Sequence, residues 1–308
     1  MTERLMLLDT ASLYFRAFYG VPDTVTAPNG TPVNAVRGLL DIIARLVSEF
    51  EPTQLVACWD DSWRPQWRVD LIPSYKEHRV ARVADDGTSI EETPEKLVVQ
   101  IPVIRQVLDA FGITVLGAPD HEADDVIGSL ASQATVPVDV VTGDRDLFQL
   151  ADDSAGVRVI YTARGMSKLE IVTDEVLRGK YGIGPEQYAD FAVMRGDASD
   201  GLPGVSGVGE KTAANLLAEY GDLDTIVAVA ADPDEPLSAT LRARLLAASD
   251  YLLVAPKVVE VVRDLDFGTV DARLRPLSSD QRAAVDALAE EWGLGGSADR
   301  ALRALGNS

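Results

Sequence analysis

The sequence predicts an α/β fold with a mainly parallel central sheet flanked by helices. The first observation is a set of short apolar runs, RLMLLD, TQLVAC, ITVL and VPVDVV, which are typical of buried strands. The second is that these runs alternate with helical patterns such as VNAVRGLLDIIARLVSEF and KLVVQIPVIRQVLDAFG. Such alternation indicates βαβ units, whose strands run parallel. In sheets of this kind, ligand sites lie beyond the carboxyl ends of the strands.

The length and composition fit a globular protein without a membrane span. The 308 residues suit one large or two modest domains. No apolar run approaches the roughly 18 residues that cross a bilayer, and the start, MTERLMLLDT, lacks the features of a secretory signal. The single cysteine, Cys58, excludes an internal disulfide, so we expect a cytoplasmic protein.

The net charge is −21, with 49 acidic against 28 basic residues. Taken alone, this balance argues against binding a polyanion. Most of the acidic residues are expected to lie on a solvated surface. Some of them, however, stand at places in the predicted fold that a solvated surface does not explain.

Acidic residues follow each of the four predicted strands. They are Asp9 after the first, Asp60 after the second, Glu122, Asp124 and Asp125 in a helical first turn after the third, and Asp144 and Asp146 after the fourth. An acid at a helix N-terminus can instead be a cap, which alone would explain Asp120 or Asp144. Crowded carboxylates need a counter-charge, and hard divalent cations supply it. We therefore predict a metal cluster.

Other site chemistries fit the sequence poorly. One cysteine and two histidines, His78 and His121, nearly exclude a His/Cys zinc site. There is no GxxxxGKS/T phosphate loop, no GxGxxG after the first strand, and no GxSxG motif. The acidic cluster is therefore the leading candidate for chemistry.

A basic, aromatic insertion follows the second predicted strand. Residues 64–82, RPQWRVDLIPSYKEHRVAR, hold five basic and two acidic residues, a local charge of +3. Trp67 and Tyr75 lie within this stretch, and Trp63 directly precedes it. Basic and aromatic side chains together suit phosphate contact and base stacking, although a solvated loop remains the alternative. The segment could explain how an acidic protein holds DNA.

A glycine-rich hairpin further along is a second candidate for nucleic-acid binding. Asp197 and Asp200 precede the segment GVSGVGEKTAANLLAEY, in which Gly204, Gly207 and Gly209 would let the backbone approach a partner closely. The N-terminus of the following helix offers N–H groups to an anion such as a DNA phosphate. Lys211 in that first turn opposes the helix dipole, which favours an anionic partner. An ordinary helix–turn–helix is the alternative.

These residues give the chain a resemblance to a known family. It resembles the bacterial 5′-nucleases, which comprise flap endonucleases and the N-terminal 5′→3′ exonuclease domain of DNA polymerase I. The matching motifs are LLDTASLYFRAFY, WDDSWRPQWRVDLIPSYKEHR, EADDVIGSLA, TGDRDLFQL and GDASDGLPGVSGVGEKTAANLL. They stand in the family's order over most of residues 7–217, and the resemblance weakens after about Tyr220.

The resemblance implies a PIN-like 5′-nuclease core with a set of functional residues. The implied metal ligands are Asp9, Asp60, Glu122, Asp124, Asp125, Asp144, Asp146, Asp197 and Asp200, holding two or more Mg²⁺ or Mn²⁺ ions, with Asp125, Asp144 and Asp146 expected in closest contact. Lys76 and Arg79 are implied to lie in a helical arch and to position the scissile phosphate. Arg16 and Arg68 match further basic positions of the motifs. A helix–three-turn–helix around the glycine hairpin is implied to grip duplex DNA, often with a potassium ion.

The sequence therefore predicts a structure-specific, divalent-metal-dependent 5′-nuclease that acts on 5′ flaps, nicks or 5′ ends in replication and repair. We expect an α/β core over residues 1–170, with the arch at about 63–95, and a helical part over 171–308, with the helix–three-turn–helix at about 190–220. We expect a stand-alone enzyme, with no polymerase domain after Ser308, that works beside a separate polymerase and ligase. A PIN-like ribonuclease and a catalytically silent DNA-binding module are the alternatives.

Overall fold

The computed structural model describes residues 3–84 and 87–306. Its strands are β1 (Leu5–Asp9), β2 (Gln54–Cys58), β3 (Val80–Val83), β4 (Ser89–Glu91), β5 (Thr114–Leu116), β6 (Val138–Thr142), β7 (Val157–Tyr161) and β8 (Glu170–Val172). Its α-helices are α1 (Thr10–Gly20), α2 (Asn34–Phe50), α3 (Gln66–Leu71), α4 (Glu95–Val98), α5 (Ile101–Ala110), α6 (Ala123–Gln133), α7 (Asp174–Tyr181), α8 (Tyr188–Arg195), α9 (Glu210–Tyr220), α10 (Leu223–Ala231), α11 (Ala239–Ala247), α12 (Ser249–Val259), α13 (Ser279–Glu291) and α14 (Gly296–Ala304). Short 3-10 helices are η1 (Glu77–Arg79), η2 (Asp146–Leu150), η3 (Met166–Lys168) and η4 (Pro185–Gln187). Within these described ranges, no helix is long and apolar enough to cross a membrane.

The central sheet has six strands in the order β5-β2-β1-β6-β7-β8. All neighbouring strands pair in parallel except β7 and β8, which are antiparallel. Every residue of β1 is buried, as expected for a central strand covered on both faces. The predicted mainly parallel sheet is therefore confirmed. Its carboxyl edge receives the ends of β1, β2, β5 and β6 together.

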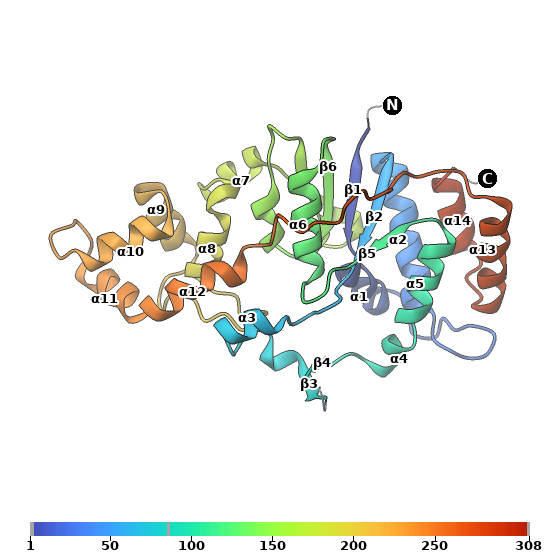
Figure 1. Cartoon of the computed structure of the whole chain (residues 1–308), viewed down its shortest axis with the longest axis horizontal. Helices are drawn as coiled ribbons and strands as arrows, with labels where there is room; N and C mark the ends of the chain where they lie inside the picture. The colour runs from blue at the N-terminus through green and yellow to red at the C-terminus, as the bar shows by residue number, and fades with distance from the viewer. Residues whose placement is uncertain (1–2, 85–86, 307–308) are drawn as a thin grey trace.

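Helices cover both faces of the sheet (Figure 1). Leu5 and Leu7 of β1 face an apolar core that includes residues of α6, α8 and α12. Met6 and Leu8 face a second core, which includes residues of α1, α2 and α5. Successive residues of a strand point to opposite faces, so one short apolar run supplies both cores.

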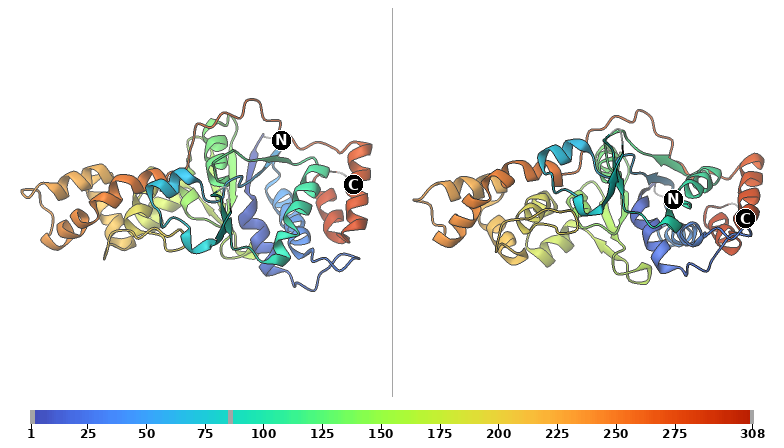
Figure 2. Two further views of the ribbon diagram at one scale, coloured as in Figure 1. Left: turned by 60° about the horizontal axis from the view of Figure 1, so that its bottom comes forward. Right: turned by 90° about the horizontal axis from the view of Figure 1, so that it is seen from below.

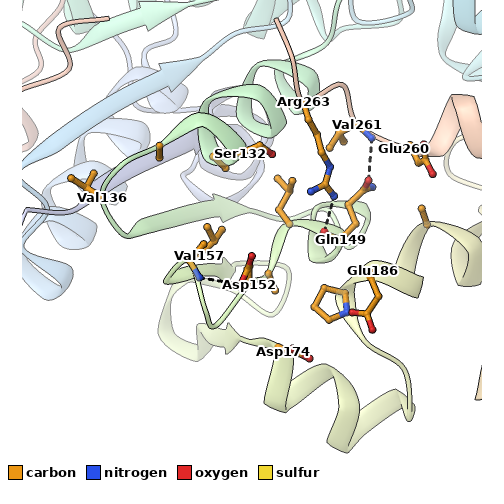
Figure 3. Close-up of a pocket in the computed structure, with 17 residues that line it drawn as sticks. Ser132, Val136, Gln149, Asp152, Val157, Asp174, Glu186, Glu260, Val261 and Arg263 are labelled. Carbon is orange, nitrogen blue, oxygen red and sulfur yellow. Dashed lines mark hydrogen bonds between the residues drawn. The ribbon is translucent and has the colours of Figure 1, made fainter.

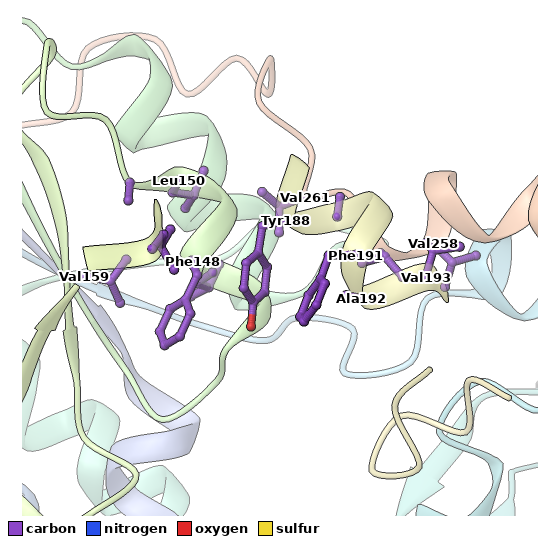
Figure 4. Packing of buried hydrophobic residues seen from close by; sticks show 14 of the residues in the cluster. Phe148, Leu150, Val159, Tyr188, Phe191, Ala192, Val193, Val258 and Val261 are labelled. Carbon is purple, nitrogen blue, oxygen red and sulfur yellow. The ribbon is translucent and has the colours of Figure 1, made fainter. Parts of the chain in front are cut away.

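Helices α8 to α12 form a distal lobe that extends from one end of the molecule (Figures 1 and 2). The lobe is joined to the sheet by aromatic packing, in which the rings of Phe148 and Tyr188 have centroids 5.4 Å apart and those of Tyr188 and Phe191 5.6 Å apart. Figure 4 shows these side chains in a row between β7 and the lobe, with Val258 and Val261 beside them. Because Phe148 belongs to η2, which follows β6, the lobe is anchored next to the acidic edge.

The last two helices do not belong to the distal lobe. A strap of irregular chain, residues 260–278, runs from α12 back across the molecule to α13 (Figure 1). There α14 packs against α2, and Arg300 donates to both carboxylate oxygens of Asp41, at 2.8 and 3.0 Å. The expected helical part, 171–308, is therefore divided between the two ends of the molecule. The amphipathic pattern of α14 indicates a helix but not which apolar surface the helix covers.

The arch segment, residues 63–95, differs from the predicted helical arch. It contains the short helix α3, the single turn η1 and the antiparallel pair β3–β4. Residues 85 and 86, within the segment, lie outside the described residues. Val80 and the β-branched residues around it favour extended chain over helix, which is the physical reason for the difference.

Candidate active site

The acidic residues that follow the strands meet at the carboxyl edge of the sheet. Asp9 is the last residue of β1, Asp60 follows β2 and Asp144 follows β6. Together with Glu122 and Asp124 from the start of α6, they line one cavity of about 230 Å³. These segments are adjacent because β1 lies between β2 and β6.

Asp9 is both a helix cap and a member of this acidic edge. Its Oδ1 accepts a hydrogen bond from the Ser12 backbone N–H at 3.2 Å, and its Oδ2 accepts one from Thr142 Oγ1 at 2.7 Å. Burial, with the nearby charges of Asp60 and Asp144, raises the pKa of Asp9 to about 7. This is how carboxylates behave when they are brought together to hold a cation.

Asp124 and Asp146 are perturbed in the same direction. Burial raises the pKa of both carboxyls well above the usual range. The charges of Asp9 and Asp144 raise the pKa of Asp124 further, and those of Asp144 and Asp200 do the same for Asp146. Oδ1 of Asp146 is buried and has no hydrogen-bond partner among the residues that the structure describes. A buried carboxylate oxygen in this position is costly unless a cation binds it.

The donor set fits a hard divalent cation that keeps part of its water shell. All the candidate donors are carboxylate oxygens, the ligands that Mg²⁺ and Mn²⁺ prefer. In the described part of the chain, no three Asp, Glu, His or Cys side chains gather closely enough to hold an ion by themselves. A bound ion would therefore also need oxygen atoms from water or from a substrate, which is usual for Mg²⁺.

Asp197 and Asp200 approach the edge from the loop between α8 and α9. Oδ1 of Asp200 accepts a hydrogen bond from Arg79 Nη2 at 2.8 Å, and Oδ1 of Asp197 accepts one from the Ser199 backbone N–H at 2.8 Å. Both carboxylates contribute to the raised pKa of Asp146. The distal lobe thus adds two carboxylates to those that the sheet supplies.

Glu122 and Asp125 are held by side chains of the arch segment. Arg68 donates to both oxygens of the fully buried Asp125, at 2.7 and 2.8 Å. Glu122 accepts from Arg68 at 3.0 Å, from the Tyr75 hydroxyl at 2.7 Å and from the Lys76 ammonium. Asp125 also forms a capping box with Glu122 at the start of α6. The structure therefore does not support the predicted close contact between Asp125 and a metal ion.

The expected DNA contacts of Arg68 and Tyr75 are not supported either. Arg68 is 2% exposed and Tyr75 is 4% exposed. Arg68 also donates to the Val258 carbonyl at 3.0 Å, where α12 ends. A basic and aromatic segment has the same composition whether it faces a partner or the protein interior, so the sequence alone could not separate the two cases.

Lys76 and Arg79 line the same cavity as the acids. Burial lowers the pKa of Lys76, but the carboxylate of Glu122 opposes this and the net pKa lies well above the usual value, so the ammonium is charged. Lys76 has a left-handed backbone, with φ 49°, and its N–H donates to the Asp200 carbonyl at 2.9 Å. The arch segment thereby places two cations beside the acidic edge, where they can neutralise an anionic group.

The glycine hairpin lies between α8 and α9, at the places expected for a helix–turn–helix. Gly204 and Gly207 have φ of 65° and 71°, a left-handed backbone that glycine adopts without strain. Gly209 has φ −98°, and a Cβ there would meet open space. Lys211 is exposed in the first turn of α9. The surface around Gly209 and Lys211 is therefore accessible to a partner.

Sequence reasoning missed some residues of the cavity. Glu91 of β4 lines it, and burial raises the pKa of that carboxyl. Ser12 and Phe15 of α1 also line it, next in sequence to the predicted Arg16, whose Nε is buried and has no hydrogen-bond partner in the described part of the chain. Ser12 and Phe15 lie within the LLDTASLYFRAFY motif, so their position just after the first predicted strand could have indicated that they border the site. Glu91 stands in a segment with no such pattern.

A larger cavity, of about 890 Å³, lies away from this edge. It lies beneath the strap, between the C-terminal part of α6 and the start of α7 (Figure 3). Its clearest polar contacts hold the strap itself. The Val261 N–H donates to Gln149 Oε1 at 3.1 Å, and Arg263 Nη2 donates to the Gln149 carbonyl at 2.9 Å. Four acidic residues also line this cavity, but two of them, Asp174 and Glu186, are already paired with Arg178.

A parallel sheet whose carboxyl edge carries oxygen ligands beside two cations is the arrangement expected of an enzyme that handles phosphate groups with divalent cations. Two family models divide the chain between them. The 5′-3′ exonuclease N-terminal resolvase-like domain matches residues 4–182, and the 5′-3′ exonuclease C-terminal SAM fold matches residues 183–281. The chain therefore belongs to the 5′-3′ exonuclease family.

Its relatives include both separate proteins and parts of polymerases. It is 58% identical to a 5′-3′ exonuclease of Streptomyces coelicolor over 97% of this chain and 99% of the relative, and 47% identical to one of Mycobacterium tuberculosis over 99% and 98%. It is 34% identical to DNA polymerase I of Bacillus caldotenax over 86% of this chain, which spans 28% of that polymerase.

Solved structures show the same fold. The structure of T5 5′-exonuclease with bound zinc has a TM-score of 0.63 at 18% identity, covering 98% of this chain and 100% of that one. The catalytic core of Rad2 in complex with DNA substrate has a TM-score of 0.63 at 17% identity, covering 99% and 92%.

Proposed function

We propose that this chain is a structure-specific, divalent-metal-dependent 5′-nuclease that hydrolyses DNA phosphodiesters at 5′ flaps, nicks and 5′ ends in replication and repair. One observation carries the proposal. Carboxylates from separate segments of the chain line a single cavity at the carboxyl edge of the sheet, and Lys76 and Arg79 line it with them. Membership of the 5′-3′ exonuclease family supports the choice of substrate, as does the shared fold with the catalytic core of Rad2, which was solved in complex with DNA substrate.

The carboxylates divide into two groups by position. Asp9, Asp60, Asp124 and Asp144 line the cavity, and Asp146 lies near Asp144 together with Asp197 and Asp200 of the distal lobe. We assign both groups to Mg²⁺ or Mn²⁺, which when bound would lower the pKa of a water and stabilise charge on the attacking and leaving oxygens. We assign Glu122 and Asp125 a supporting role, because the arch segment already occupies their oxygens.

Lys76 and Arg79 would bind the scissile phosphate. Both are charged, both line the cavity, and both are held by carboxylates that a phosphate could replace or share. Cations fixed in place before the reaction stabilise developing charge without reorganisation. The hairpin at Gly209 and Lys211 would bind backbone phosphates of the duplex, at a distance from the cleavage site.

A potassium ion at the hairpin is not required by this proposal. The Gly207 carbonyl already accepts a hydrogen bond from Arg244 Nη1 at 3.1 Å, and the Val205 carbonyl accepts one from the Val208 N–H at 2.9 Å. The loop thus has a cationic side chain of its own. For the setting, we propose the cytoplasm, with a separate DNA polymerase and ligase acting on the same DNA.

The test compares labelled 5′-flap DNA, the matching RNA and single-stranded DNA, each with and without Mg²⁺. Metal-dependent cleavage of the flap DNA near its junction supports the proposal. Cleavage of the RNA alone would instead indicate a PIN-like ribonuclease. Tight flap binding without cleavage in Mg²⁺ or Mn²⁺ would indicate a DNA-binding module that lacks activity.

A further inference from the structure

Arg244 of α11 lies over the glycine hairpin. Its Nη1 donates to the Gly207 carbonyl at 3.1 Å. A Cβ on Gly207 would stand 2.6 Å from the guanidinium carbon of Arg244. The missing side chain at Gly207 therefore makes room for the guanidinium, in addition to permitting the left-handed turn.

Arg244 is a cation that the protein itself does not neutralise. Its side chain belongs to an exposed residue, and it makes no ion pair within residues 3–84 and 87–306. The carbonyl contact uses one N–H of the guanidinium, so other N–H groups remain for an external acceptor. Because the contact orients the planar group, an anion could be bound by two parallel hydrogen bonds.

Two of the other cations of the distal lobe are committed elsewhere, whereas Lys257 of α12 is exposed. Residues 188–259 contain 11 acidic and five basic residues. Arg242 donates to four backbone carbonyls, including those of Val229 and Ala230. Arg195 is 9% exposed in its side chain and pairs with Asp197. DNA that binds to so acidic a lobe must therefore contact its few unpaired cations. Two of these, Lys211 and Arg244, lie next to the hairpin.

We propose that Arg244 binds a backbone phosphate of duplex DNA beside Gly207, as a partner of Lys211 across the hairpin. The inference rests on the proposed function, because it names how that enzyme holds the uncut duplex. The carbonyl of Gly207 fixes the guanidinium, and the phosphate takes its remaining donors. Phosphate contacts carry no base information, so the contribution is the same for every DNA sequence.

The experiment measures the affinity of flap DNA in Ca²⁺ over a salt series for wild type, Arg244→Ala and Arg244→Gln. Arg303→Ala is the matched control, because Arg303 is an exposed arginine on α14 at the opposite end of the molecule. Melting curves confirm folding, and single-turnover cleavage in Mg²⁺ on saturating flap DNA gives the chemical rate. Glutamine retains an N–H donor for the Gly207 carbonyl but carries no charge.

Both Arg244 variants should bind about 10-fold more weakly, as expected for one lost charge-assisted contact. Their log-affinity against log-salt slope should be shallower by about 0.9. Cleavage at saturation should stay within about twofold, and Arg303→Ala should match wild type. Wild-type affinity and slope in Arg244→Ala would overturn the proposal. Wild-type affinity in Arg244→Gln would also overturn it, because it would show that Arg244 only supports the loop through the Gly207 carbonyl. Failure of the wild type to cut flap DNA would instead overturn the proposed function.

Discussion

Arg68 holds Asp125 by two parallel hydrogen bonds, of 2.7 and 2.8 Å, in a place that solvent does not reach. The pair joins the arch segment to the first turn of α6, which carries Asp124. Arg68 also reaches the Val258 carbonyl at the end of α12, so the same guanidinium contacts the distal lobe. Because Arg68 is 2% exposed, its position supports the geometry of the acidic edge and leaves almost none of its surface for a partner.

Neutralising Asp125 should destabilise the protein. In Asp125→Asn, the buried guanidinium of Arg68 loses the carboxylate that binds it by two hydrogen bonds, and breaking a buried pair costs about 3–5 kcal/mol. The free energy of unfolding from urea titrations, measured without metal, should fall by roughly that amount. Arg45→Ala is a suitable control, because the Arg45–Glu49 pair is exposed and should contribute under about 1 kcal/mol. Unchanged stability in Asp125→Asn would show that Arg68 does not depend on this carboxylate.

Asp146→Asn should have the opposite effect on stability. The charge of Asp146 is disfavoured by burial and by neighbouring carboxylates, and its Oδ1 has no donor, so removing the charge relieves repulsion. We expect equal or higher thermal stability without metal, together with at least a 100-fold loss of flap cleavage in Mg²⁺. The measurements are a melting curve and single-turnover cleavage. Near-normal cleavage would remove Asp146 from the metal site.

The stability of the metal-free protein should fall as the pH rises from about 4 to about 7. Asp9 has a pKa of about 7 in the folded protein against an ordinary value of 3.8, so within this window the folded state keeps a proton that the unfolded state has lost. The loss due to Asp9 is at most about 4 kcal/mol. Asp9→Asn should flatten the plot of unfolding free energy against pH, measured by urea unfolding in EDTA. At neutral pH, Mg²⁺ should restore the stability of the wild-type protein. A wild-type profile in Asp9→Asn would contradict the shift.

Lys76→Ala should slow the chemical step more than binding. Its ammonium would neutralise the scissile phosphate, and losing such a group costs about 100-fold in rate. Single-turnover cleavage on saturating flap DNA measures this rate. Tyr75→Phe is the control, because it removes a hydrogen bond to the same carboxylate of Glu122 without removing a cation. If both variants slow cleavage equally, Lys76 acts only by holding Glu122; an unchanged rate with weaker binding would make it a docking residue.

Gly209→Val should fold normally and bind duplex DNA weakly. Gly209 has an ordinary φ, and among the described residues no atom beyond its chain neighbours lies within 4 Å of a Cβ placed there. The valine side chain would therefore occupy the surface where the duplex is proposed to lie. Affinity in Ca²⁺ should fall while the melting temperature stays within about 2 °C. Gly204→Ala provides the contrast, because its φ is 65° and its Cβ would stand 2.7 Å from the Arg195 backbone, so that variant should lose stability. Wild-type affinity in a folded Gly209→Val would exclude a duplex contact here.

The parallel sheet could be predicted because its strands are buried on both faces and therefore appear as unbroken apolar runs. The acids at the strand ends followed from the same pattern, since parallel strands bring their carboxyl ends to one edge. β7 and β8 were not identified. The run VRVIY of β7 is interrupted by Arg158, and β8 has only three residues, so neither forms an unbroken apolar run. The strand order and the register are determined by contacts between segments that are far apart in the sequence. The pattern of a single apolar run carries no information about those contacts.

The arch segment was predicted least well. Its basic composition correctly indicated that the segment lies beside the acidic edge, since Lys76 and Arg79 line the acidic cavity. Composition could not assign each cation a partner. Arg68 and Lys76 are eight residues apart in one basic stretch, yet Arg68 neutralises Asp125 in the interior while Lys76 borders the cavity. Which of them turns inward depends on the buried carboxylates of α6, and thus on tertiary packing.

The return of the chain through the strap to α13 and α14 sets a practical limit on shortening this protein. A protein cut at residue 281, where the second family model ends, would keep every acidic residue of the edge and the whole hairpin. It would lose most of α13 and all of α14, and would expose the apolar side of α2, which α14 covers. Bare apolar surface of that kind promotes self-association. An inactive shortened protein would therefore have to be examined for aggregation before its inactivity could be attributed to the chemistry of the site.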